Sequence, residues 1–185
     1  MNTLEQISRT VENQKHTVIA AFVPLELSLL NYKPAPDSWS ILECLEHLNR
    51  YSRYYNQVLA KAINANTGSE HEQKISYTWL GKKSLDMVRP DNGKKSKTVR
   101  HMNPNNSQLS HQTLEEFLDH QTELLQLLDK AKDANLNKKA IPVEFFKLLK
   151  LRIGETLEFV ALHQERHLQQ ALKVKKQLPV TQAAA

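Results

Sequence analysis

Three histidines have the spacing and the placement to bind one divalent metal ion. His163 and His167 lie four residues apart, so on a helix their imidazoles point the same way, about 6 Å apart. This spacing is a common metal chelate on helices. His47 belongs to an earlier segment with helical periodicity, and all three lie at the edge of an apolar stripe. The sequence therefore predicts that they converge at one ion, and unrelated surface or core histidines are the alternative.

An open coordination position is expected at such a site. Three protein ligands with a free fourth position are typical of catalytic metal sites, whereas structural sites are closed. The run His163-Gln164-Glu165-Arg166-His167 is not the H-E-x-x-H motif of metalloproteases, because glutamine follows the first histidine. Glu165 lies about 200° around the helix from His163 and should face away. We therefore expect no general protease activity.

Other reactive side chains lie near the first histidine in the sequence. The hydroxyl of Tyr51 or Tyr54 could meet a metal-bound water, and Cys44 could be a ligand or nucleophile. Glu43 or Glu46 could orient the imidazole from outside the ligand set. Simpler interpretations are favoured: packing for the tyrosines, a buried inert thiol, and exposed carboxylates on a helix.

Apolar residues recur at three- and four-residue steps in four stretches, which predicts four amphipathic helices. The predicted helices cover residues 3–27, about 40–65, about 113–134, and 143 to about 177. Gly154 could divide the last of them. Before the second helix, Asp37, Ser38 or Ser40 could be the cap, and Ser40 with Glu43 forms a capping-box pattern.

A long connector separates the second and third predicted helices. Residues 66–110 are rich in turn residues, and their apolar clusters predict short helical or irregular pieces packed on the other helices. Such a connector would let those two helices lie parallel. We therefore predict one all-α domain over residues 1–178, a four-helix bundle with up-down-down-up packing, followed by a flexible tail at 179–185.

Composition and charge are those of an ordinary soluble globular protein. The chain is 40% apolar and 24% charged, and it has no run of about 18 apolar residues that would predict a membrane span. The single cysteine fits a reducing cytoplasm. The net charge of +5 permits nucleic-acid binding without indicating it, and the basic stretch 82–101 favours a solvated loop. We expect neither nucleic acid nor a membrane as a partner.

Two segments carry a resemblance to a known family. Residues 36–48, PDSWSILECLEHL, place a tryptophan-containing turn before a helix that bears His47. Residues 162–170, LHQERHLQQ, place arginine before the second histidine of an H-x-x-x-H pair and glutamine after it. These motifs, their order and their separation resemble the DinB-like metalloenzymes over nearly the whole chain. The resemblance implies a four-helix bundle, often a homodimer, in which His47, His163 and His167 bind zinc, nickel or a similar ion.

The resemblance implies no single reaction, since the family includes thiol S-transferases and suspected hydrolases. Our leading hypothesis is a metal-dependent enzyme that activates a water or a thiol, for hydrolysis of a small molecule or for thiol transfer. The alternative is a non-catalytic metal-binding helical bundle that acts as a binding or interaction module. Nucleic-acid binding through the basic stretch is a third hypothesis.

Overall fold

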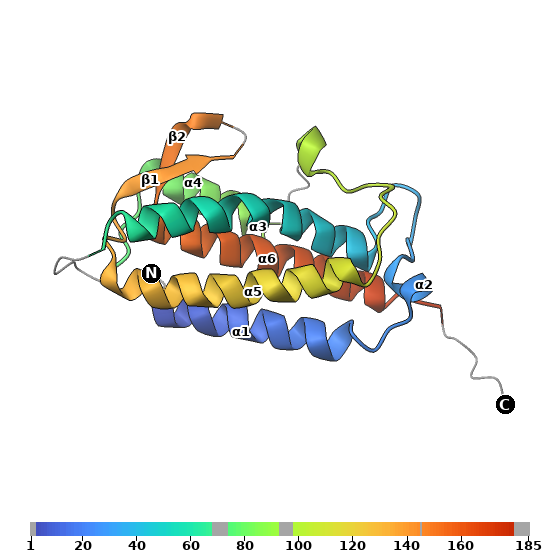
Figure 1. Ribbon diagram of the computed structural model, residues 1–185. Coiled ribbons are helices and arrows are strands. Elements are labelled where there is room, and N and C mark those ends of the chain that lie inside the picture. Colours follow the sequence, from blue (N-terminus) through green and yellow to red (C-terminus); the bar gives the residue numbers. More distant parts are fainter. Residues whose placement is uncertain (1–2, 68–73, 93–97, 145, 180–185) are drawn as a thin grey trace.

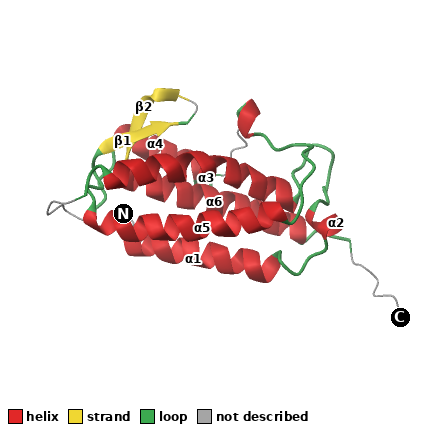
Figure 2. Ribbon diagram, viewed as in Figure 1, coloured by secondary structure: helices red, strands yellow, loops and turns green. Residues whose placement is uncertain are grey.

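The computed structural model describes residues 3–67, 74–92, 98–144 and 146–179, and these residues are mostly helical (Figures 1 and 2). Four long helices lie side by side in this part of the chain: α1 (Leu4–Ala21), α3 (Ile41–Asn64), α5 (Gln112–Lys130) and α6 (Ile153–Lys175). The shorter elements are α2 (Leu27–Leu30), α4 (Trp79–Val88), η1 (Arg100–Met102), η2 (Ala131–Asp133), and an antiparallel hairpin of β1 (Lys139–Val143) and β2 (Phe146–Arg152).

Each long helix packs against two others. Helix α3 contacts α5 and α6, α1 contacts the same two helices from the other side, and α4 packs on α6. In Figure 1, α1 and α6 run in one direction and α3 and α5 in the other. Side-chain amides tie the parallel pair: Asn49 Nδ2 donates to the Thr113 carbonyl at 2.8 Å, and Asn56 Nδ2 to the His120 carbonyl at 3.3 Å. The segment between α3 and α5 thus returns the chain to the end where α3 began.

Helix α3 begins at Ile41, and Ser40 is its N-cap among the three candidates. Its Oγ accepts from the Glu43 backbone N–H at 3.1 Å, and Glu43 Oε2 accepts from the Ser40 N–H at 2.9 Å. This reciprocal capping box satisfies two backbone donors that the helix itself leaves without partners. The cap fixes the start of the helix two turns before His47.

Two predicted helix boundaries are wrong. The helix predicted over 3–27 ends at Ala21, and α2 follows after a turn. The helix predicted from 143 begins only at Ile153, because residues 139–152 form the hairpin. Gly154 does not divide α6 but lies in its first turn, where a Cβ would press against the Ile75 side chain. Hairpin pairing between distant positions overrode the local helical propensity of residues 146–151.

The predicted connector, residues 66–110, contains the two short elements α4 and η1 in its described part. The apolar clusters predicted to pack on the other helices include Leu85 and Val88 of α4, which are buried. Lys82 and Lys83 are exposed on the same helix. The lysines at 94, 95 and 97 of the basic stretch, and nearly all of the predicted tail, lie outside the described residues.

A polar level divides the hydrophobic core into two clusters. One cluster surrounds Leu59 and Leu157, and the other surrounds Leu45 and Leu168. Between them each long helix contributes at least one polar residue that is at most 2% exposed, among them Gln14 from α1, Ser52 from α3, Gln121 from α5 and Gln164 from α6. Gln14 hydrogen-bonds to α6 and Gln121 to Gln14, and such directional bonds constrain how the helices align. In the described part of the chain no helix has the length and apolar character to cross a membrane.

Candidate metal centre

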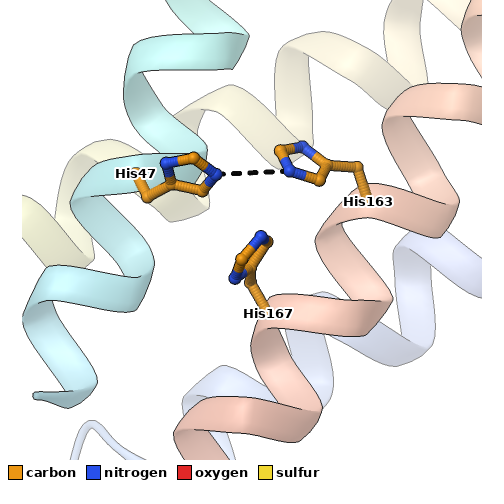
Figure 3. A group of neighbouring side chains, drawn as sticks. All are labelled: His47, His163 and His167. Atoms are coloured by element: carbon orange, nitrogen blue, oxygen red, sulfur yellow. Dashed lines mark hydrogen bonds between the residues drawn. The ribbon is translucent and has the colours of Figure 1, made fainter. Parts of the chain in front are cut away.

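The structure brings His47, His163 and His167 together, as the sequence predicts (Figure 3). One ring nitrogen from each histidine lies within 4.8 Å of those of the other two. His47 comes from the second turn of α3, and the other two come from successive turns of α6. Nε2 of His47 and Nε2 of His163 are 3.3 Å apart. Antiparallel packing of α3 against α6 thus creates a cluster of three imidazoles.

Hydrogen bonds on the outer ring nitrogens orient two of the imidazoles. His47 Nδ1 lies 2.8 Å from the Met102 carbonyl oxygen, and His167 Nδ1 lies 3.0 Å from Gln170 Oε1. Because these oxygens only accept, each Nδ1 carries the proton and each neutral ring keeps a lone pair on Nε2. Such bonds commonly fix the tautomer and orientation of metal-binding histidines.

The Met102 carbonyl is itself held in place from α3. Arg50 Nη1 donates to the carbonyls of His101 and Asn103 at 3.2 and 2.9 Å. The guanidinium also binds Glu46, with Nε 2.8 Å from Oε1. These bonds fasten η1 against α3, one turn beyond His47. Arg50 is therefore the residue through which the helix positions the partner of its own histidine.

Aromatic rings enclose the three imidazoles. The Trp39 ring lies 4.9 Å from that of His47 and 5.6 Å from that of His167, centroid to centroid. Tyr51 lies 4.5 Å from His163 on another side, and Phe159 lies 5.8 Å from it. The rings lower the local dielectric and so strengthen electrostatic interactions at the cluster.

Burial keeps the imidazoles neutral at physiological pH. It lowers the pKa of His47 to about 4 and the pKa of His167 to about 3. It also lowers the pKa of His163 well below its ordinary value, and the neighbouring histidines add to that effect. A neutral imidazole is the form that binds a metal ion, so no proton must be displaced first.

The donor set fits a divalent metal. Two nitrogens bound to a tetrahedral ion at about 2.0–2.1 Å are about 3.3 Å apart. Nε2 of His47 and Nε2 of His163 have this separation, and the candidate nitrogens of all three histidines lie within 4.8 Å of one another. Imidazole nitrogens suit zinc, nickel and copper.

A cavity of about 910 Å³ opens beside the histidines. Its wall includes the turn at Trp39, Tyr51 of α3, and Met87 and Val88 of α4. Arg166 and Lys173 of α6 also line it. The volume is that of a small-molecule site. A ligand in this space could approach the three imidazoles directly.

The other candidate side chains have diverse roles. Glu165 points away from the cluster, as predicted, and accepts from Gln14 Nε2 at 3.3 Å and from Gln169 Nε2 at 3.0 Å. Cys44 is fully buried, which raises the pKa of its thiol and makes it inert, as predicted. The Tyr54 hydroxyl donates to the Pro142 carbonyl at 3.2 Å. Tyr51, in contrast, lines the cavity.

The prediction of exposed carboxylates at Glu43 and Glu46 is wrong. Their residues are 2% and 8% exposed. Glu43 completes the capping box and accepts from the Asn106 backbone N–H at 2.6 Å, while Glu46 pairs with Arg50 and Arg53. Each buried carboxylate thus has cationic or N–H partners, which burial of a charge requires.

Sequence reasoning missed the groups that orient the imidazoles. Gln170 follows His167 by three residues, and this spacing on a helix is a signal that could have identified it. Met102 contributes a backbone carbonyl from a segment 55 residues away from His47, and no side-chain pattern indicates such a partner.

These features define a mostly helical protein with a cluster of three histidines, two buried and one partly buried, on the wall of a cavity. The model of the DinB superfamily matches residues 10–171, and the chain belongs to this family. It is similar to the uncharacterized protein YuaE of Bacillus subtilis (strain 168), with 25% identity over 149 residues, which cover 80% of this chain and 85% of YuaE. No solved structure gives a significant match.

Proposed function

We propose that the protein is a metal-dependent enzyme that acts on a small molecule through one divalent ion, zinc or nickel, held by His47, His163 and His167. The observation that carries the proposal is the convergence of three neutral imidazoles beside a cavity of about 910 Å³. When bound, an ion with three neutral ligands would keep its full double charge and lower the pKa of a water or thiol.

The chain's own residues would orient the ligands and shield them from solvent. Met102 and Gln170 hold the outer nitrogens of His47 and His167, so that both lone pairs are directed before any ion arrives. Trp39 packs on the same two rings. Burial raises the pKa of Tyr51 to about 12, so its hydroxyl keeps its proton and can donate a hydrogen bond to a substrate in the cavity.

The arrangement supports chemistry in which the ion itself activates the nucleophile. Glu165, the acidic residue closest in sequence to both histidines of α6, is directed toward Gln14 and Gln169 and cannot be a general base at the cluster. Hydrolysis of an activated small molecule, or transfer of a thiol to an electrophile, therefore fits better than peptide cleavage.

The topology, the domain bounds and the oligomeric state of the molecule are part of the same proposal. We propose that the four long helices form a four-helix bundle of up-down-down-up topology within one domain, residues 1–178. We also propose a cytoplasmic homodimer that does not bind nucleic acid. Light scattering of the purified protein tests the dimer.

The decisive experiment assays the metal-loaded protein beside its His47→Ala variant. Peptides, activated esters, and thiols paired with electrophiles are the three substrate classes. We expect metal-dependent turnover of an ester or a thiol–electrophile pair by the wild type alone. Metal-dependent peptide cleavage would contradict the proposal. A metal-loaded protein without activity on any class would favour a non-catalytic metal-binding module.

A further inference from the structure

We propose that Gln14 of α1 is a positioning residue for the metal centre, because it sets the register of α6 and so the placement of His163 and His167 against His47. The inference rests on the proposed metal-binding function. Gln14 itself contacts none of the three histidines. It acts through the backbone and side chains around two of them.

Gln14 contacts α6 on both sides of His163. Its Nε2 donates to the Ala161 carbonyl at 2.9 Å and to Glu165 Oε2 at 3.3 Å. Ala161 lies two residues before His163, and Glu165 lies two residues before His167. The amide is 1% exposed, so water does not compete for these bonds. One buried side chain of α1 therefore hydrogen-bonds to the segment of α6 that bears both histidines.

The same amide is connected to the helix that bears His47. Gln121 of α5 donates from Nε2 to Gln14 Oε1 at 3.4 Å. Helix α5 is joined in turn to α3 through Asn49, whose Nδ2 donates to the Thr113 carbonyl at 2.8 Å, two residues after His47. Side-chain amide hydrogen bonds thus join α3 to α5, α5 to α1 and α1 to α6, and the α5 helix itself spans the two turns between Thr113 and Gln121. The two ligand-bearing helices are linked by these bonds as well as by their direct contact.

Hydrogen bonds can fix a register that apolar contacts leave loose. Burial of apolar surface is non-directional, so it defines the position of α6 less sharply than hydrogen bonds of fixed geometry do. A hydrogen bond weakens steeply when its distance or angle departs from the optimum. Gln14 lies at the polar level between the clusters, on the part of α1 that faces the histidine-bearing turns of α6. Its directional bonds therefore act where a slide would separate the ligands.

Two variants of α1 separate positioning from simple stability. Gln14→Met keeps the volume and removes the hydrogen bonds. Val11→Ala, one turn earlier and fully buried, opens a cavity without touching these amide hydrogen bonds. We expect Gln14→Met to bind zinc about tenfold more weakly, as for the loss of other groups that orient ligands, and to change the visible spectrum of the cobalt-loaded protein. Val11→Ala should lower the melting temperature and leave both readouts unchanged.

A metal-free measurement completes the test. Nitrogen NMR of the imidazoles reports their tautomers and hydrogen bonds, including the 3.3 Å contact between His47 and His163. Gln14→Met should shift these signals, and Val11→Ala should not. Wild-type spectra and zinc affinity in Gln14→Met, or equal losses in both variants, would overturn the inference. If the wild type itself bound no metal, the proposed function would fail, and the NMR comparison would still decide whether Gln14 sets the register.

Discussion

Each imidazole of the cluster faces the other two with a nitrogen while aromatic rings surround it. Two lone pairs directed at each other across 3.3 Å repel, unless one ring donates a proton or a cation lies between them. A bound cation would satisfy all three rings at once. Because all three rings would share one cation, removal of any single histidine should abolish metal binding.

His163 lies on α6 in ring contact with both other histidines. We expect His163→Ala to abolish stoichiometric metal binding, because two imidazoles on different helices chelate far more weakly than three. Elemental analysis of the purified protein measures the metal content. His16→Ala, on the exposed side of α1, is the matched control and should bind as the wild type does. Unchanged metal content in His163→Ala would refute the ligand assignment.

The depressed histidine pKa values make the stability of the metal-free protein depend on pH. Burial lowers the pKa of His47 from 6.5 to about 4, so the unfolded chain binds its proton first as the pH falls. The stabilisation is therefore fully present above the unfolded pKa and is lost as the pH falls from 6.5 toward 4. At about 1.4 kcal/mol per pH unit, His47 alone should account for about 2 kcal/mol between pH 7 and pH 5.

Urea unfolding at those two pH values measures this loss. His47→Gln cannot take up the proton, so its stability should fall by about 2 kcal/mol less than that of the wild type over the same interval. His16→Gln should follow the wild type. Parallel pH dependence in the wild type and His47→Gln would show that burial does not suppress protonation of His47.

At the scale of elements, α4 depends on a close approach to α6. A Cβ on Gly81 would overlap the carboxylate of Glu155. That carboxylate accepts from the Thr78 N–H at the start of α4, and from the Arg152 N–H at 2.9 Å at the start of α6. Glu155 thus satisfies backbone donors of both helices and has little freedom to withdraw.

We expect Gly81→Ala to destabilise the protein by about 1–3 kcal/mol, the usual cost of overpacking. It should also displace α4, whose Met87 and Val88 line the cavity. Thermal unfolding measures the loss. Lys82→Ala, exposed on the same helix, is the control for altered helix propensity and should have little effect. If Gly81→Ala were as stable as the control, the contact between α4 and Glu155 would not hold the two helices together.

Elements were predictable from the sequence wherever local signals decide them. The capping box of Ser40 and Glu43 was one of the candidate starts of α3 and is the one the structure has, and α6 keeps its helical period from Ile153 onward. The hairpin before α6 was missed because it depends on pairing such as Lys139 with Arg152, which no local period encodes. The same distinction between local signals and tertiary contacts applies to the residues of the site. Spacing and periodicity, together with the family resemblance, indicated the three histidines, whereas the Met102 carbonyl is placed by tertiary packing.

At the scale of the whole molecule, we expect the fold to be stable without a metal. The two hydrophobic clusters draw residues from all four long helices and hold many fully buried side chains, among them Phe22, Tyr55 and Phe117. Zinc fingers, in contrast, lack such a core and unfold without their ion. The centre is therefore built on a scaffold that is already folded.

This contrast predicts how the protein responds to chelation. A ligand that binds only the folded state, present at one hundred times its Kd, contributes about 2.7 kcal/mol, which corresponds to a shift in Tm of about 5–10 °C for a chain of this size. Chelation should remove that shift and leave the far-ultraviolet circular dichroism unchanged at room temperature, because the helices are held by apolar burial. His163→Ala should show neither the shift nor a response to chelator. Loss of the helical signal on chelation at room temperature would instead mean that the ion is structural, since the two clusters would then be too weak to hold α3 and α6 together without it.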